Sequence, residues 1–472
     1  MAEDTRLGTR VLDRFGTTVA DMVSEKPQTA ANLLLRAFEL KQFQTRHLPE
    51  RGLLPSGRAG ARIALESVTG ALEHPREAVL TSIFLPTEIF QAMGLRPLVA
   101  EALSDFITGA HAEEGFVRAA EQRGIPETYC SYHKVLLGAA AAKVLAPPRL
   151  IANCSVACDA NNTTFRWLAE GLGAPQVYVD VPYAYDAESC AYVADQLREL
   201  AHVAEDVYGR ALDEAELSRA VGRSQQTLAA LVRGLPLRRG RYLANDMGLE
   251  MQQALALHPS LGQRDTLAMA ERMLVDFPRA EAYRGLSLAW MHTAPYFSYS
   301  LQQMLSQNQG AQSIVSDMCY DQVSFDGWEH GAGEPYEAMA ERLIKNAFNG
   351  PATRRVGRLR RLAEETGADG VVCFCHWGCK ETMGASQLAK RELEAAGIPV
   401  LVLDGDGCHR ANNAEGQAST RLGAFLEMLR ARKADGGGRV AVSAGDGAPA
   451  PAGSTGNVGA GAVDDGDAEE VA

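Results

Sequence analysis

The chain has 472 residues, 46 % of them hydrophobic, so it is long enough for more than one domain with a core of its own. A formal net charge of −13 argues against non-specific binding of nucleic acid. The opening segment is too polar for a signal peptide, and no apolar run approaches the about 18 residues that a membrane span needs. We therefore expect a cytoplasmic protein whose nine cysteines stay reduced and serve metal binding or catalysis.

The first half of the chain is predicted to be a helical region followed by a sheet. Residues 1–75 have apolar residues at helical spacing, with a break at the Pro55-Ser-Gly stretch. The strands predicted next are 79–85, 95–99, 150–153 and 176–181. Gly94 is expected to end a helix between the first two strands. Two amphipathic helices, 187–209 and 213–234, should then form a hairpin that leaves the sheet.

The second half repeats the alternation of strands and helices. Its predicted strands are 286–291, 312–316, 371–374 and 399–403, and its predicted helices are 298–306, 355–366, 381–396 and 418–432. This alternation predicts an α/β fold with parallel sheets, divided into domains at 76–235 and 236–432. Residues 433–472 are rich in Gly, Ala, Ser, Asp and Pro, and are predicted to be a disordered tail.

Cysteines gather where predicted strands end or helices begin. They are Cys130, before a helix; Cys154 and Cys158, after the strand 150–153; and Cys373, Cys375 and Cys379, at or past the end of the strand 371–374. Ligands of open parallel sheets bind at the carboxyl ends of the strands. A lone cysteine is usually a small buried hydrophobe, and we interpret Cys190 and Cys319 in that way.

Three of the thiols are better suited to a ligand role than to packing. Polar residues follow Cys130, Cys158 and Cys379, and helix N-termini favour thiolates. The close Cys-x-x-Cys pairs typical of zinc sites do not occur in the sequence. Iron–sulfur clusters accept scattered cysteines, and three thiolates from three loops would leave one iron open. A zinc-stabilised binding protein remains the alternative.

Four motifs together resemble the 2-hydroxyacyl-CoA dehydratase and benzoyl-CoA reductase family of iron–sulfur proteins. They are Pro86-Thr-Glu-Ile-Phe-Gln-Ala-Met-Gly-Leu, Cys158-Asp, His376-Trp-Gly-Cys-Lys-Glu, and Glu415-Gly-Gln with Thr420-Arg. The resemblance runs from about residue 79 to 429. It implies two doubly wound, Rossmann-like parallel-sheet domains with a [4Fe-4S] cluster between them.

The resemblance also implies a ligand set and a reaction. The ligands it implies are Cys130, Cys158 and Cys379. Cys154, Cys375 and Cys408 are extra to the pattern. A relative holds a double-cubane cluster with more thiolates, so Cys154 or Cys375 could be further ligands. The reaction would remove water from a 2-hydroxyacyl-CoA through a ketyl radical, after one electron has been added to the thioester.

Several polar residues near these motifs could contact the substrate or carry a proton. His133 and Lys134 follow the first thiol, and Glu88 opens a helix near the same sheet edge. Each of them could equally be a solvated or helix-capping group. His376 is better placed, as a hydrogen-bond donor to a sulfur.

The sequence contains no Walker motif and no strand–Gly-x-Gly-x-x-Gly–helix unit, so we expect neither ATP nor a dinucleotide to bind this chain. The resemblance implies a separate ATP-hydrolysing iron–sulfur activator and a homologous second subunit. The alternatives are an ATP-dependent reductase of the same family, of the benzoyl-CoA reductase or double-cubane type, and a non-catalytic subunit that relays electrons. The sequence does not identify the acyl group.

Overall fold

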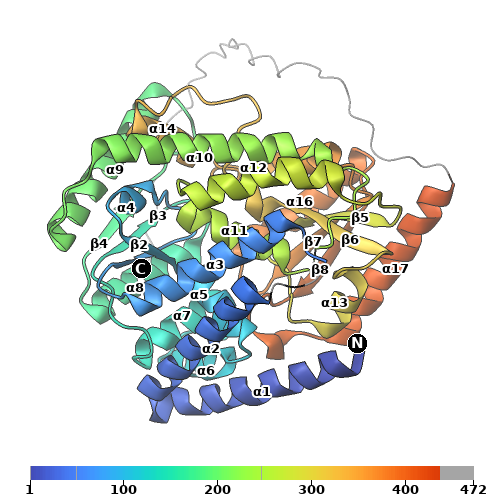
Figure 1. Ribbon diagram of the computed structural model, residues 1–472, viewed down its shortest axis with the longest axis horizontal. Coiled ribbons are helices and arrows are strands. Elements are labelled where there is room, and N and C mark those ends of the chain that lie inside the picture. The colour runs from blue at the N-terminus through green and yellow to red at the C-terminus, as the bar shows by residue number, and fades with distance from the viewer. Residues whose placement is uncertain (1, 49, 51, 246, 436–472) are drawn as a thin grey trace, which may run out of the picture. The chain divides into compact units, whose positions relative to one another are not determined.

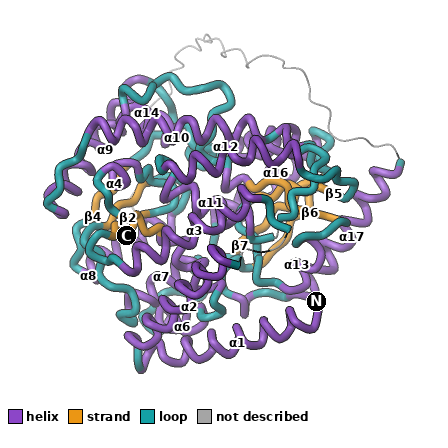
Figure 2. The backbone as a smooth tube through the Cα atoms, in the orientation of Figure 1, coloured by secondary structure: helices purple, strands orange, loops and turns teal. Residues whose placement is uncertain are grey.

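Two four-stranded parallel sheets organise the structure, each among packed helices (Figures 1 and 2). The computed structural model describes residues 2–48, 50, 52–245 and 247–435. Each sheet is built from strands that alternate with helices along the chain, and this confirms the predicted α/β fold class.

The N-terminal region is helical, as predicted, and consists of α1 (Ala2–Glu25), α2 (Pro27–His47) and α3 (Pro55–Glu73). The predicted break at Pro55-Ser-Gly is wrong, because α3 already begins at Pro55, where proline suits the first turn. Gly57 and Gly60 lie inside this helix, which packs against α11 and α12. A Cβ on Gly57 would lie 3.1 Å from a methyl of Leu249, so these glycines permit close approach of the helices.

The first sheet has the strand order β2-β1-β3-β4, and all its neighbours are parallel. Its strands are β1 (Ala78–Thr81), β2 (Arg96–Val99), β3 (Ile151–Cys154) and β4 (Gln176–Val179), which confirms the four predicted strands. Its helices are α4 (Glu88–Ala92), α5 (Ala100–Gly109), α6 (Glu113–Glu121), α7 (Ser131–Ala141) and α8 (Asp159–Leu172).

The two predicted helices are confirmed as α9 (Ala187–Tyr208) and α10 (Glu214–Gly234), but each packs mainly against other helices and not against its neighbour, so the predicted hairpin is wrong. The side chains of Asp186 and Asp213 accept hydrogen bonds from backbone N–H groups in the first turns of these helices. Further helical elements, which the sequence did not reveal, are η1 (Pro236–Arg238), α11 (Leu249–Ser260), α12 (Arg264–Arg279) and α14 (Pro335–Ile344).

The second sheet has the order β6-β5-β7-β8 and is also fully parallel. Its strands are β5 (Leu286–Met291), β6 (Ala311–Ser316), β7 (Gly370–His376) and β8 (Val400–Gly405), again as predicted. The helical elements here are α13 (Tyr299–Leu305), η2 (Asp317–Cys319), α15 (Ala352–Thr366), α16 (Lys380–Ala395), η3 (Arg410–Asn412) and α17 (Glu415–Ala434). Every residue of β5, β6 and β7 is buried, as expected for a parallel sheet covered on both faces.

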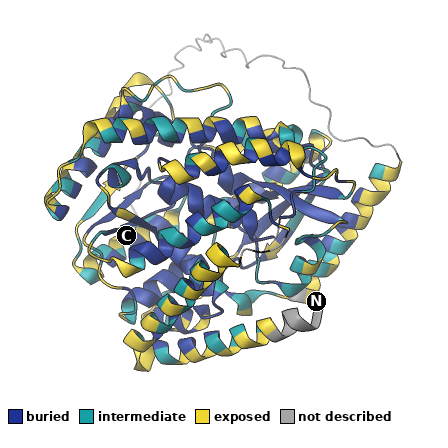
Figure 3. Cartoon of the chain, in the orientation of Figure 1, coloured by how far each residue is buried: buried dark blue, intermediate teal, exposed yellow. Residues whose placement is uncertain are grey.

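Both sheets are doubly wound, because the chain reverses its direction of travel across each sheet. The reversal lies between β1 and β3 in the first sheet and between β5 and β7 in the second. Figure 3 shows most strand residues as buried, whereas exposed residues gather on the outer faces of helices such as α1 and α12. The crevice at the carboxyl ends of strands beside such a reversal is where open α/β sheets bind ligands.

The C-terminal prediction needs a correction. Helix α17 ends at Ala434, so Lys433 and Ala434 are helical, and Lys433 Nζ donates a hydrogen bond to the Gly285 carbonyl at 2.9 Å. The rest of the predicted tail, residues 436–472, lies outside the described residues. The division into domains at residue 235 stays a prediction. No helix in the described part of the chain is long and apolar enough to cross a membrane.

Candidate functional site

The three cysteines singled out by sequence each stand immediately before a helix. Cys130 is the N-cap of α7, Cys158 is the N-cap of α8 after β3, and Cys379 is the N-cap of α16 after β7. The positive end of each helix dipole therefore faces a sulfur and favours its thiolate form. The first two cysteines come from segments of the first sheet, and the third comes from the second sheet.

A glycine brings these segments into contact. Gly378 has a φ of +82°, and a Cβ at this position would lie 2.6 Å from the Cα and the backbone nitrogen of Cys130. Only glycine combines this left-handed conformation with so close an approach. The loop after β7 is thereby held against the start of α7, which brings Cys379 to the side of Cys130.

The three sulfurs are close enough to interact electrostatically. Burial, helped by the neighbouring sulfurs of Cys158 and Cys379, raises the pKa of Cys130 well above its usual value. Burial and the charge of Cys379 likewise raise the pKa of Cys158. Burial and mutual repulsion therefore favour neutral thiols, and the three sulfurs would become thiolates together only with a bound cation to balance their charge.

Two imidazoles contact these sulfurs. His376 Nε2 lies 3.3 Å from Cys130 Sγ, and His133 Nε2 lies 3.6 Å from Cys158 Sγ. Burial lowers the pKa of His376 to about 4 and that of His133 to about 3, so both rings are neutral near pH 7. The backbone N–H of Gly407 donates to His376 Nδ1 at 2.9 Å. The proton of His376 therefore lies on Nε2, which donates to the sulfur of Cys130.

The remaining cysteines have other surroundings. Cys154 Sγ lies 4.0 Å from Ser82 Oγ, and burial raises its pKa to about 12. A hydrogen bond between Cys373 and Cys375 raises the pKa of the former and lowers that of the latter. The charge of Cys379 also acts on Cys375, so Cys375 lies near the site.

Cys190 and Cys319 are buried, as their interpretation as packing residues requires. Cys319 Sγ donates to the Glu250 carbonyl at 2.8 Å, whereas Cys190 Sγ lies 3.6 Å from His330 Nε2. Neither contact involves one of the three helix-capping cysteines. Cys408 Sγ lies 3.0 Å from Thr108 Oγ1.

Glu88 and Lys134 are placed in buried charge pairs. Glu88 Oε1 lies 2.6 Å from Arg342 Nη2 and accepts a hydrogen bond from Ser224 Oγ at 2.5 Å. Lys134 Nζ lies 2.8 Å from Glu121 Oε1. A buried charge needs such a partner, and these contacts explain both side chains structurally. A catalytic role for Glu88, His133 or His376 stays a prediction.

His292 was missed by the sequence reasoning. It follows β5, has a φ of +76°, and its ring centroid lies 5.9 Å from that of His376. Both of its ring nitrogens are buried and have no hydrogen-bond partner among the described residues, and the same holds for Thr293 Oγ1. Strained backbone and unpaired buried polar atoms are typical of functional sites. The end of a strand, the rule used for the cysteines, could have identified His292.

A single metal ion and a cluster make different demands on the three thiols. The described residues contain no group of three or more His, Cys, Asp or Glu side chains that could hold one metal ion. A [4Fe-4S] cluster makes a different demand, because each thiolate binds a different iron and the sulfurs surround the cluster. Three thiols from three helix starts, beside two neutral imidazoles, are a donor set of that kind.

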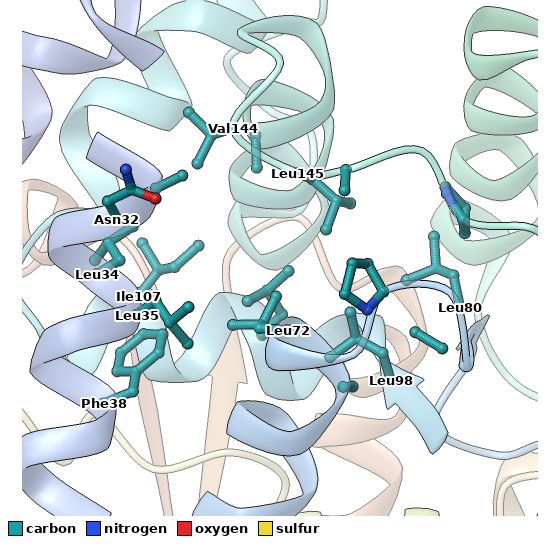
Figure 4. A pocket seen from close by; sticks show the side chains of 18 of the residues that line it. Asn32, Leu34, Leu35, Phe38, Leu72, Leu80, Leu98, Ile107, Val144 and Leu145 are labelled. Atoms are coloured by element: carbon teal, nitrogen blue, oxygen red, sulfur yellow. The ribbon is translucent and has the colours of Figure 1, made fainter. Parts of the chain in front are cut away.

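A separate cavity of about 230 Å³ lies between α2, α3 and the first sheet (Figure 4). Its walls are almost entirely aliphatic, as Leu35, Leu72 and Val144 show in the close-up. Gln28 and Asn32 are the polar side chains in its lining. The lining includes Ala78, where β1 begins, so the cavity lies toward the end of the sheet opposite the strand-end cysteines. No His, Cys, Asp or Glu side chain lines this cavity, so it offers no metal ligand.

The comparisons with known proteins agree with the sequence motifs. Residues 82–429 match the protein family described as 2-hydroxyglutaryl-CoA dehydratase, D-component. The (R)-phenyllactyl-CoA dehydratase alpha subunit of Clostridium sporogenes is 21 % identical over 373 residues, covering 74 % of this chain and 88 % of the relative. The lactoyl-CoA dehydratase subunit alpha of Anaerotignum propionicum is 23 % identical over 392 residues, covering 74 % of this chain and 90 % of the relative. A match of this extent confirms the predicted resemblance, and the chain belongs to the 2-hydroxyglutaryl-CoA dehydratase D-component family.

Proposed function

We propose that this chain is a subunit of an iron–sulfur 2-hydroxyacyl-CoA dehydratase, a lyase that removes water from a 2-hydroxyacyl-CoA thioester. Membership of the family supports the reaction class, and the names of the two relatives, both alpha subunits, support a complex with other subunits. The observation that carries the proposal is the meeting of three helix-capping thiols beside neutral imidazoles at the carboxyl ends of β3 and β7.

Cys130, Cys158 and Cys379 are the proposed cluster ligands. A [4Fe-4S] cluster bound there would supply one-electron chemistry and an iron with no fourth protein thiolate, able to act as a Lewis acid. The helix N-termini favour the three thiolates, and the Nε2–H of His376 withdraws charge from the sulfur of Cys130.

The open polar atoms of His292 and Thr293 support a position for the substrate. Burial lowers the pKa of His292 to about 4, so its ring is neutral and has one N–H donor and one acceptor. The carbonyl oxygen of a thioester can accept a hydrogen bond from the N–H of this ring, and an α-hydroxyl group can donate one to its other nitrogen. Hydrogen bonds between substrate oxygens and these buried atoms would remove a desolvation penalty of roughly 1–3 kcal/mol for each unpaired group.

The reaction needs an electron because the β C–H bond of the substrate is far too weakly acidic for any side-chain base. One electron on the thioester carbonyl gives a ketyl radical anion, which expels the α-hydroxyl as hydroxide. The resulting radical has a much more acidic β-hydrogen, and after its loss the electron is returned. The net reaction is the loss of one water to give an enoyl-CoA, with the electron recycled.

The test is to purify the full chain without oxygen and to measure its iron and sulfide content. Cys130→Ala, Cys158→Ala and Cys379→Ala should each lower the iron content, because each removes a thiolate ligand. Cys319→Ala is the control, since Cys319 is a buried thiol that bonds to a backbone carbonyl elsewhere, and the iron content of this variant should equal that of the wild type.

The same wild-type protein is then tested for formation of enoyl-CoA from lactoyl-CoA and phenyllactyl-CoA, with a partner subunit, an activator, ATP, Mg²⁺ and a strong reductant. Iron and sulfide near four per chain together with enoyl-CoA product are the expected result. Zinc in place of iron, or equal iron in all four variants, would refute the proposal.

A further inference from the structure

A second polar pocket lies at helix α15, outside the thiol site. It is a cavity of about 270 Å³, lined by residues 323–326, by Lys345, and by Gly357, Arg358 and Arg361 of α15. Gly357 is exposed and has nothing within 4 Å of where a Cβ would be, so this side of the helix is open. Three cationic side chains in one cavity make it a candidate site for an anion.

Three cations and four carboxylates meet at this pocket, and the cations differ in how closely they are paired. Lys345 Nζ is paired with Glu341 at 2.7 Å and with Glu329 at 2.9 Å. Arg361 lies 3.9 Å from Asp326, whose side chain is 95 % exposed, and 3.8 Å from Glu365, so neither contact is a hydrogen bond.

Arg358 has no ion pair within the described residues and donates one hydrogen bond, to the Val323 carbonyl. Burial is the main cause that lowers its pKa to about 10, with Arg361 and Arg354 acting in the same direction. Phe325 holds the two guanidinium groups in place, since those of Arg361 and Arg358 lie 3.9 and 5.2 Å from its ring centroid. Arg358, which has no ion pair among the described residues, lies beside Arg361, whose carboxylate contacts are longer than hydrogen bonds, and guanidinium groups of this kind can bind phosphate.

Helix α15 joins this pocket to the thiol site. Arg355, one turn before Arg358, donates hydrogen bonds to Glu381 and Thr382 at 2.9 Å, in the first turn of the helix that Cys379 caps. At a rise of 1.5 Å per residue, the backbones of Arg358 and Arg361 lie roughly 5 and 9 Å further along the helix axis. The segment 323–326 follows η2, which begins directly after the carboxyl end of β6.

We propose that the pocket formed by Phe325, Lys345, Arg358 and Arg361 binds the phosphate groups of the CoA nucleotide while the acyl thioester lies beside His292 and the three thiols. This inference rests on the proposed function and adds the residues that recognise the CoA portion of the substrate. A thioester of CoA carries a 3′-phosphate and a diphosphate at the far end of its pantetheine arm, and Arg358 and Arg361 can each donate two hydrogen bonds to such groups.

The experiment measures binding to the full chain by isothermal titration calorimetry without oxygen. The probes are CoA, dephospho-CoA and pantetheine. Arg358→Gln and Arg361→Gln remove one charge each and keep most of the side-chain length. Arg360→Gln is the matched control, because Arg360 neighbours Arg361 on the same helix, pairs with Glu364 at 2.7 Å and does not line the pocket.

Each of the two pocket variants should weaken CoA binding at least tenfold, whereas Arg360→Gln should change it less than twofold. Pantetheine binding should be equal in all proteins, because it lacks the phosphates. Since Arg358 bonds to Val323 and Arg361 packs on Phe325, thermal unfolding of each variant is measured, and a loss of CoA affinity is assigned to binding where the unfolding temperature is unchanged.

The outcomes separate the pocket from the proposed function. Equal CoA affinity in Arg358→Gln, Arg361→Gln and Arg360→Gln overturns the pocket and leaves the dehydratase proposal intact. A wild-type chain that contains iron but binds no CoA or acyl-CoA overturns the substrate class itself. Weakened CoA binding with unchanged dephospho-CoA binding would assign the pocket to the 3′-phosphate.

Discussion

At the scale of single residues, burial controls protonation in and around the thiol site. The same desolvation that keeps His376 and His133 neutral raises the pKa of buried carboxyl groups nearby. Burial raises the pKa of Asp105, on α5, to about 7, and its Oδ1 has no hydrogen-bond partner among the described residues. Burial also raises the pKa of Glu101 to about 7.

Asp105 makes a testable contribution to the pH dependence of stability. Its pKa in the folded protein is higher than the usual unfolded value of about 3.9, so the folded state binds the proton more tightly. This contribution to stability is complete below about pH 4 and is lost as the pH rises through about 7. Its full size is ~4 kcal/mol at most, from about three pKa units.

Asp105→Asn should remove this loss. From pH 5 to pH 8.5, the free energy of unfolding of the variant should rise by a few kcal/mol relative to that of the wild type. Thermal unfolding of both proteins at the two pH values measures this change. Glu101 titrates in the same range but is present in both proteins, so its effect cancels in the comparison. An equal difference in unfolding temperature at the two pH values would contradict the prediction.

At the scale of elements, the strand end is the unit that builds the site. Cys158 and Cys379 follow β3 and β7, and His292 follows β5, each beside the point where its sheet reverses direction. Because parallel strands present their carboxyl ends on one edge, residues far apart in sequence meet there. The helix that follows each cysteine then supplies its positive end to the sulfur.

Gly378 tests how tightly these elements must approach. Gly378→Ala places a Cβ 2.6 Å from the backbone of Cys130 at a φ of +82°, so the loop and α7 must separate. We expect a loss of stability of about 2–4 kcal/mol from strain and displaced packing, together with a lower iron content. Thermal unfolding and iron analysis of the same samples measure both effects.

Gly384 is the matched control for this substitution. It lies in α16, six residues further on, is exposed, and has nothing within 4 Å of where its Cβ would be. Gly384→Ala should therefore keep the iron content and stabilise the helix by roughly 0.5–1 kcal/mol. A Gly378→Ala protein with wild-type iron content would mean that the close approach does not position Cys379.

The strands were predictable from sequence, but their surroundings were less so. All eight strands were found. Fully buried parallel strands, such as β7, read as short apolar runs, whereas β4 and β8 are only partly buried. Helices such as α11 and α12 were missed. In α11, polar residues such as Glu250 and Gln253 are buried together with the apolar ones, so its sequence shows no apolar stripe. Proline at Pro55 was read as a break although it opens α3.

For the site, sequence identified side chains but not their pairing. Cys130, Cys158 and Cys379 were chosen from their positions before helices, and the structure places them near one another. The contact of Glu88 with Arg342 joins residues more than 250 positions apart, and no local pattern could reveal it. The two ring nitrogens of His292 could not be predicted either, because their lack of hydrogen-bond partners among the described residues results from tertiary packing.

At the scale of the whole molecule, the proposed chemistry exceeds what the chain can drive alone. Segments of both sheets contribute thiols to one site, and the α15 pocket lies beside the second sheet. Reducing a thioester by one electron requires a potential near the lower limit of iron–sulfur clusters, about −700 mV. The sequence contains no Walker motif whose loop could couple ATP hydrolysis to that step.

The last prediction follows from this energy requirement. The purified chain alone should not dehydrate a 2-hydroxyacyl-CoA, even when it contains its full complement of iron and is kept reduced. Activity should appear when a separate ATP-hydrolysing iron–sulfur activator, the second subunit, ATP and Mg²⁺ are added without oxygen. Enoyl-CoA formation is followed by its absorbance, and a non-hydrolysable ATP analogue is the control that should give none. Because the electron is recycled after each turnover, far more than one enoyl-CoA should form per electron injected. Sustained turnover by this chain alone without ATP would instead favour ordinary Lewis-acid chemistry at the open iron, and the activator would have no part in the reaction.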